Sequence, residues 1–178
     1  RGDWAKDLPV NTFTEGMEIL YFPGCYLSYD PRLKKVSRAT AAILNKAGVD
    51  FGILGSQESC CGESIRKTGD EEVFKRLAKE NIKAFVDNGV KKILVSSPHC
   101  YHTFKNEYPE FMVHFEVVHI TQYLLELIRE GRLTLSGEYP KAVTWHDPCY
   151  LGRHNGILNE PRQLIQQLEA GLIEMPRH

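Results

Sequence analysis

The sequence predicts an α/β fold in which a mostly parallel sheet carries helices on both faces. Two observations predict this fold. Short, β-prone apolar segments alternate with segments of helical periodicity along the 178 residues, and parallel strands need such crossover connections. A strand followed by Cys149 late in the chain repeats the arrangement of the first strand and its cysteine. We therefore expect a first, Rossmann-like lobe followed by the start of a second, similar lobe.

Local signals define the elements of the first half of the chain. Segment 17–22 is apolar and β-prone, and it ends at a Pro-Gly turn. Asp30 and Pro31 are a good N-cap and a good first residue for a helix that ends at Gly48. Segment 50–54 is predicted to be a short buried strand.

The alternation of strands and helices continues through the second half. A helix is predicted from Asp70 to Gly89, because apolar residues lie on one of its faces and charged residues on the other. Segment 113–120 is β-branched and aromatic, and Thr121 is the predicted N-cap of a helix that ends at Gly131. The remaining predicted elements are strands at 93–95, 142–145 and 172–175 and a helix at about 161–170.

The composition is that of a globular protein, with 42% hydrophobic and 25% charged residues. A formal net charge of −1, with charges of both signs mixed along the chain, argues against nucleic-acid binding. No apolar run approaches the roughly 18 residues of a membrane span, and the N-terminus has no signal-peptide pattern. Five cysteines without a secretion signal favour metal or redox chemistry and a cytoplasmic protein. Both chain ends resemble those of a fragment.

The cysteines are the candidate functional residues. Each of the five falls just past the predicted C-terminal end of a strand, at the edge where open α/β sheets bind ligands. Cys25, Cys60, Cys61 and Cys100 follow three successive strands, so their sulfurs are expected to meet at one edge. Gly62 would let the backbone approach a bound group or adopt a positive φ. The arrangement therefore predicts a site for a metal or an iron–sulfur cluster.

Other interpretations of the cysteines stay open. Single cysteines are often buried without any ligand, and a strained disulfide within the adjacent pair is a further alternative. A phosphatase site is excluded, because the residues six positions after Cys100 and Cys149 are Asn106 and Asn155 instead of arginine.

Histidines and tyrosines adjoin several of the cysteines. His99, His102 and His146 are candidate ligands or proton carriers, with loop histidines bonded to backbone as the alternative. His114 and His119 lie in or beside a predicted strand and are assigned structural roles. Three tyrosines are expected to be packing shields that keep the site dry: Tyr26, Tyr101 and Tyr150.

Five motifs accompany these residues. They are Phe22-Pro23-Gly24-Cys25, Cys60-Cys61-Gly62-Glu63, Ser97-Pro98-His99-Cys100-Tyr101, Phe104-Lys105-Asn106-Glu107-Tyr108-Pro109 and His146-Asp147-Pro148-Cys149-Tyr150-Leu151-Gly152-Arg153. Together they resemble the cysteine-rich CCG domain family over nearly the whole chain, from about Ile19 to Met175. Members include heterodisulfide reductase catalytic subunits and the iron–sulfur subunits of glycolate oxidase and of anaerobic glycerol-3-phosphate dehydrogenase.

The resemblance implies Rossmann-like lobes and a 4Fe-4S cluster, cubane or non-cubane, although one motif holds zinc in some relatives. It implies an oxidoreductase subunit that passes electrons between a flavoprotein, quinone or ferredoxin and a thiol or disulfide substrate. The implied partner is a flavoprotein or another iron–sulfur subunit, through which the domain could associate with a membrane. By position, Cys25, Cys60, Cys61 and Cys100 match the ligands of the first motif, and Cys149 matches the opening of the second.

The same resemblance suggests how the chain is divided. We expect an N-terminal extension at 1–16, a first CCG lobe at 17–131 and an incomplete second CCG lobe at 140–178. The rest of the second motif, with another Cys-Cys-Gly, is expected beyond His178.

Ser97 departs from the family pattern, because the usual residue there is the first of a pair of cysteines. Four sulfurs can still complete a zinc site or bind a cubane cluster, whereas a five-cysteine non-cubane cluster would lack a ligand.

Three functions are therefore compared. The leading hypothesis is an iron–sulfur electron-transfer domain of a heterodisulfide-reductase-like oxidoreductase. The alternative is a zinc-binding structural or docking domain of the same complex, which the serine replacement favours. A cluster-free thiol–disulfide enzyme is the third, although the sequence contains no Cys-x-x-Cys motif.

Overall fold

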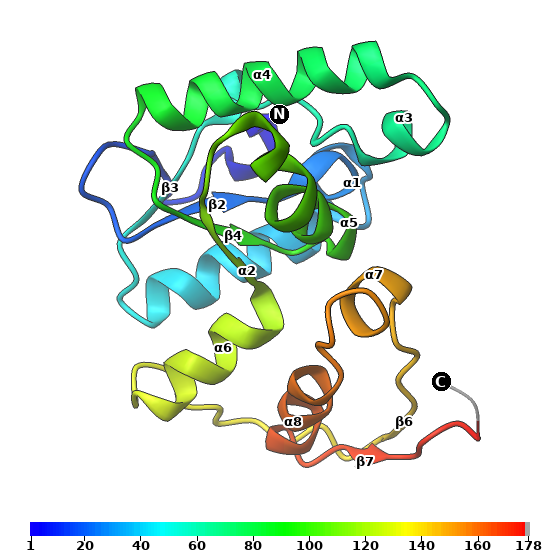
Figure 1. The fold of residues 1–178 in the computed structure, drawn as a ribbon. Coiled ribbons are helices and arrows are strands. Elements are labelled where there is room, and N and C mark those ends of the chain that lie inside the picture. The colour runs from blue at the N-terminus through cyan, green and yellow to red at the C-terminus, as the bar shows by residue number, and fades with distance from the viewer. Residues whose placement is uncertain (177–178) are drawn as a thin grey trace.

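A five-stranded parallel sheet forms the centre of the molecule (Figure 1). The computed structural model describes residues 1–176. The strands lie in the order β1-β3-β2-β4-β5, and every neighbouring pair is parallel. Their bounds are β1 Asn11–Thr12, β2 Ile19–Phe22, β3 Phe51–Ile53, β4 Lys92–Val95 and β5 Glu116–His119. The predicted α/β class is confirmed.

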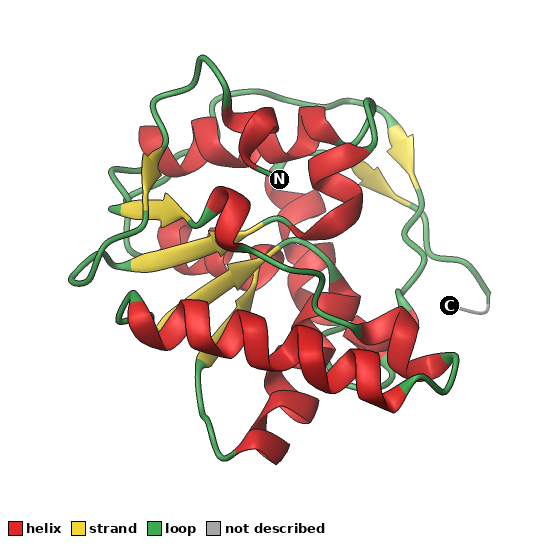
Figure 2. Ribbon diagram, turned by 90° about the horizontal axis from the view of Figure 1, so that it is seen from above, coloured by secondary structure: helices red, strands yellow, loops and turns green. Residues whose placement is uncertain are grey.

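Helices connect the strands and lie on both faces of the sheet, as the view in Figure 2 also shows. The α-helices are α1 Gly24–Tyr29, α2 Lys34–Lys46, α3 Glu63–Lys67, α4 Glu71–Asp87, α5 Pro98–His102, α6 Ile120–Arg129, α7 Cys149–Gly152 and α8 Asn159–Gln167. Shorter turns of helix are η1 Gly2–Ala5, η2 Gly55–Gln57, η3 Thr103–Glu107 and η4 Tyr108–Phe111, of which η3 is a π-helical turn. None of the helices described within residues 1–176 is long and apolar enough to cross a bilayer.

Strand β2, at the centre of the sheet, packs against the helices on both faces. All four of its residues are fully buried. Because successive side chains of a strand point to opposite faces, Leu20 and Phe22 pack in the core cluster that contains Phe85 of α4. Ile19 and Tyr21 pack in the other cluster, with apolar residues of α2 and α6. A strand buried on both faces has a continuous apolar sequence, as Ile19–Phe22 does.

The first sixteen residues contribute to this sheet and its core. Asn11 and Thr12 form the edge strand β1, which pairs with β3. Trp4 and Phe13 are each only 2% exposed, and the ring of Trp4 meets that of Tyr21 edge to face at 5.7 Å. The segment predicted as an extension therefore packs on the first lobe.

A second, smaller unit follows α6. Strands β6 Ala142–Val143 and β7 Gly171–Leu172 form a parallel pair joined through α7 and α8. Helix α8 packs against α6, and α7 packs against α5. This strand–helix–strand order agrees with the start of a second lobe. The boundaries 1–16, 17–131 and 140–178 stay predictions, and residues 177–178 lie outside the described part of the chain.

Two helix starts differ from the predicted ones. The Asp30 carboxylate accepts hydrogen bonds from the backbone N–H groups of Arg32 and Leu33, so it closes a turn before α2 begins at Lys34. The N-cap of α6 is His119 and not Thr121, and its ring accepts from the backbone of Thr121. Helix α4 begins at Glu71, next to Asp70 as predicted, and Asp70 caps it by accepting from the backbone N–H of Val73.

Acidification is expected to destabilise the fold through His119. Its ring is buried, with Nε2 at 3.2 Å from the carbonyl oxygen of Ser96 and Nδ1 at 2.9 Å from the hydroxyl of Thr121. Burial lowers the pKa of His119 to about 4, although the bond to Ser96 opposes the shift. In the unfolded chain the His119 ring takes up a proton near pH 6.5, whereas in the folded protein it stays neutral down to about pH 4. Over this window the free energy of unfolding should fall by about 3 kcal/mol.

Urea unfolding at several pH values from about 7.5 to about 4 measures this loss. The variant His119→Gln cannot titrate, so its stability should depend less on pH than that of the natural sequence. If the stability of the two proteins depends equally on pH, the loss of stability on acidification does not come from His119.

Candidate functional site

Four cysteines line one cavity of about 270 Å³. They are Cys25, Cys60, Cys61 and Cys100. All of them are free thiols; Cys61 and Cys100 are buried, while Cys25 and Cys60 are half-buried. The structure thus brings together the four cysteines that the sequence places after three different strands.

The topology of the sheet causes this convergence. Cys25 lies in the first turn of α1, directly after β2, and Cys100 lies in α5, after β4. Cys60 and Cys61 precede α3 in the loop after β3. Strands β3, β2 and β4 are adjacent and parallel, so their C-terminal ends meet at one edge of the sheet. Helices α1, α3 and α5 gather on that side (Figure 1).

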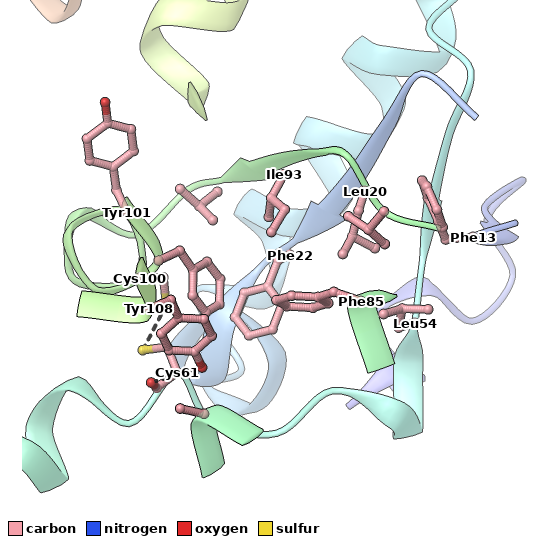
Figure 3. Packing of buried hydrophobic residues seen from close by; sticks show 14 of the residues in the cluster. Phe13, Leu20, Phe22, Leu54, Cys61, Phe85, Ile93, Cys100, Tyr101 and Tyr108 are labelled. Atoms are coloured by element: carbon pink, nitrogen blue, oxygen red, sulfur yellow. Dashed lines mark hydrogen bonds between the residues drawn. The ribbon is translucent and has the colours of Figure 1, made fainter. Parts of the chain in front are cut away.

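The sulfurs of Cys61 and Cys100 are 3.4 Å apart, at one end of the apolar core cluster (Figure 3). Gly24 makes room beside them. Its φ is +83°, and a Cβ on it would lie 3.1 Å from the Cys100 sulfur. The backbone at the start of α1 therefore approaches the site closely because residue 24 has no side chain.

Hydrogen bonds among the thiols shift their pKa values in opposite directions. Bonds from Cys25 and Cys61 lower the pKa of Cys60 well below the usual thiol value. The bond to Cys60, together with burial, raises the pKa of Cys25. The pKa of Cys61 is raised by the bond it shares with Cys100, by Cys60 and by burial. Cys60 is therefore the thiol of the group whose pKa is lowered, which favours the thiolate, the form that binds metals.

Asn81 of α4 holds the loop that carries the adjacent cysteines. Its side-chain nitrogen donates to the carbonyl oxygen of Cys60 at 2.9 Å, and its oxygen accepts from the backbone N–H of Ser59 at 2.8 Å. The same nitrogen lies 3.1 Å from the hydroxyl of Tyr108, which donates to the carbonyl oxygen of Cys61. Asn81 is fully buried. An asparagine on the apolar face of a helix is the sequence signal that could have identified it, because buried amides need partners.

Glu63, His99 and Tyr150 form a polar rim beside the cysteines. Glu63 and His99 line the cavity, with 3.1 Å between a Glu63 carboxylate oxygen and Nδ1 of His99. The ring of Tyr150 lies 4.8 Å from that of His99. Burial alone would raise the pKa of Glu63, but hydrogen bonds from Tyr150 and Ser64 and the nearby His99 lower it below the usual value. Of the candidate histidines, His99 is the one that the structure places at the cavity.

The shielding role predicted for Tyr101 is wrong, whereas that of Tyr26 stays a prediction. Tyr26 lines the cavity but is 72% exposed. Tyr101 is buried, yet its ring points away from the sulfurs of Cys61 and Cys100 (Figure 3) and meets the ring of His119 at 6.1 Å. Neighbouring residues of a helix point about 100° apart. Tyr101, which follows the cavity-lining Cys100 in α5, is therefore turned out of the cavity.

The other predicted residues lie elsewhere. Cys149 is exposed, and it does not line the cavity. His102, at the end of α5, packs against the rings of Tyr150 and His154 and does not line the cavity. His114 and His146 are exposed.

Gly62 has the positive φ expected from the sequence, at +90°. The neighbour that a side chain would meet belongs to the protein itself. A Cβ on Gly62 would lie 2.7 Å from the ring of Phe74 in α4. Gly62 is therefore needed for packing of the loop on α4, and a large substitution there would not leave the fold intact.

The donor set fits an iron–sulfur cluster. Thiolates are the protein ligands of such clusters, and four thiols surround a space here. Ser97 also lines this space, at the position where the family usually has a fifth cysteine. Within residues 1–176, no group of three or more His, Cys, Asp or Glu side chains is arranged to hold a single metal ion.

Comparisons with known proteins agree with the cysteine motifs. A family model described as the CCG cysteine-rich domain matches residues 19–105 and 143–178. The chain is 43% identical to an EtfAB:quinone oxidoreductase of Syntrophomonas wolfei over 90% of its length and 22% of that relative. It is 42% identical to a probable iron-sulfur-binding oxidoreductase, FadF, of Bacillus subtilis, over 98% of its length and 26% of the relative.

A third relative is a subunit of the dihydromethanophenazine:CoB–CoM heterodisulfide reductase of Methanosarcina barkeri. It is 36% identical over 90% of this chain and 40% of its own length. The chain thus spans less than half the length of these relatives. No solved structure gives a significant match. The motifs, their convergence at one sheet edge and the match to the family model together show that the chain belongs to the cysteine-rich CCG domain family.

Proposed function

We propose that this domain holds an iron–sulfur cluster on Cys25, Cys60, Cys61 and Cys100 and transfers electrons within a larger oxidoreductase. The observation that carries the proposal is the convergence of four thiols, from the ends of three strands, on one cavity. The names of the relatives support it, since they include an iron-sulfur-binding oxidoreductase and a heterodisulfide reductase subunit.

The burial of the four cysteines suggests how such a site would work. A cluster supplies one-electron chemistry when bound. Cys61 and Cys100 are 5% and 4% exposed, so they would anchor the cluster and shield it from water. Cys25 and Cys60 are half-buried and lie on the open side, where an electron donor or acceptor would approach. A 4Fe-4S cluster is the type proposed, because the family resemblance implies it and four thiolates can ligate it.

The proposed partner is a flavoprotein or another iron–sulfur subunit of the same complex. Support comes from the relatives, because one is an EtfAB:quinone oxidoreductase and another is a subunit of a reductase. The cytoplasmic location stays a prediction.

An anaerobic analysis of the chain after reconstitution with iron and sulfide tests the proposal. We expect about four iron atoms and about four sulfides per chain, with a brown colour and a visible absorption band that dithionite bleaches. Purification of a colourless protein with one zinc ion, which reconstitution does not convert, would instead support the zinc-binding structural domain.

A further inference from the structure

Arg1 is a buried cation in contact with one of the four cysteines. Its side chain is only 7% exposed. The guanidinium Nη2 donates to the Cys25 sulfur at 2.9 Å, and the group lies over the ring of Phe22 at 5.6 Å from the centroid. Nothing in the sequence patterns indicates this contact, because 24 positions separate the two residues.

The segment that carries Arg1 is anchored to the first lobe. Trp4 is buried against Tyr21. Arg38 of α2 donates to the carbonyl oxygens of Trp4 and Lys6, at 2.8 and 3.0 Å. The guanidinium is therefore held at the site by packing and hydrogen bonds of its own segment.

Glu58 is the counter-ion of Arg1. A carboxylate oxygen of Glu58 lies 3.8 Å from Nη1 of Arg1, and the Glu58 side chain is 1% exposed. Its other oxygen accepts from the backbone N–H of Leu54 at 3.3 Å. Within residues 1–176, Nη1 of Arg1 makes no hydrogen bond. Burial raises the pKa of Glu58 to about 7, so above that pH the cysteine site has one buried positive and one buried negative group nearby, and the positive one touches a sulfur.

We propose that Arg1 raises the reduction potential of the cluster, an inference that rests on the function proposed above. One-electron reduction adds one negative charge to the cluster and its thiolates. A buried cation within hydrogen-bond distance of a ligand sulfur stabilises the more negative state. Hydrogen bonds to sulfur and local charge are known determinants of cluster potentials. Reduction in this scheme takes up an electron and no proton.

Potentiometric titration of the reconstituted chain, with dithionite as reductant, tests the inference. Arg1→Met removes the charge and the N–H donors, so the midpoint potential should shift to a lower value while iron and sulfide per chain stay unchanged. Arg1→Lys keeps the positive charge, so its midpoint potential should lie between that of Arg1→Met and that of the unmodified chain. The matched control is Arg76→Met, which removes the same charge from an exposed position on α4 and should leave the potential unchanged.

Glu58→Gln provides a test of opposite sign. Measured at about pH 8.5, where the Glu58 carboxyl is ionised, it removes the negative counter-ion but keeps an oxygen that can accept from Leu54, so the potential should rise. If Arg1→Met fails to bind iron, the potential of Glu58→Gln tests the proposed role of Arg1 in its place. If the midpoint potential is the same in the unmodified chain, in Arg1→Met and in Glu58→Gln, the proposed role of Arg1 is refuted while the proposed cluster stands. Absence of iron from the unmodified chain would overturn the proposed function, and the role of Arg1 with it.

Discussion

Replacing Cys61 by serine is expected to remove most of the bound iron. Cys61 is 5% exposed, and its sulfur lies 3.4 Å from that of Cys100. A serine hydroxyl at this position stays protonated at neutral pH and is a poor ligand for a metal that prefers sulfur. Water has little access to take its place. Changes to groups that merely support a ligand already cost roughly 10–100-fold in metal affinity, so loss of a ligand should cost at least that much.

Iron and sulfide per chain, measured after anaerobic reconstitution, show the loss. Cys149→Ser is the matched control, because Cys149 is an exposed thiol that does not line the cavity. It should retain the iron of the unmodified chain. Full iron in folded Cys61→Ser, or equal loss in both variants, would refute the four-cysteine site.

Replacing Gly62 by alanine is expected to destabilise the fold by about 3 kcal/mol, as the sum of two costs. A left-handed backbone costs a non-glycine residue roughly 1–2 kcal/mol, and forcing extra volume into a packed core costs roughly 1–3 kcal/mol. Both costs apply at Gly62, where φ is +90° and the new Cβ would lie 2.7 Å from the ring of Phe74. That ring is fully buried, and the guanidinium of Arg66 lies over it at 4.5 Å. The ring therefore has little room to move away.

Gly69→Ala separates the two costs. Gly69 has a similar φ, +95°, but a Cβ there would meet no atom within 4 Å. Urea unfolding should show a loss of about 1 kcal/mol for Gly69→Ala, and a clearly larger loss for Gly62→Ala. If the two variants lose the same stability, Phe74 yields without cost and the packing argument for Gly62 fails.

Side-chain direction within short helices shows where sequence reasoning reaches its limit. The sequence motifs place Tyr26 and Tyr101 next to Cys25 and Cys100, and neighbours in sequence are expected to be neighbours at the site. In α5, which begins at Pro98, Tyr101 is turned away from Cys100, whereas in α1, which begins at Gly24, Tyr26 lines the cavity but is largely exposed. These helices are only six and five residues long, too short for a periodic pattern to reveal them, so the directions of their side chains could not be assigned.

The sequence by itself determined the α/β class and the residues that meet at one sheet edge. Both depend on local patterns: apolar runs that alternate with amphipathic helices, and cysteines that follow the ends of strands. Only the tertiary structure decided which groups surround the cysteines. Asn81 lies 21 positions from Cys60, and Arg1 lies 24 positions from Cys25. Such contacts depend on how helices and loops pack in space. The apolar helix face around Asn81 indicates a buried amide but not its partners, and no pattern near Arg1 indicates its contact with Cys25.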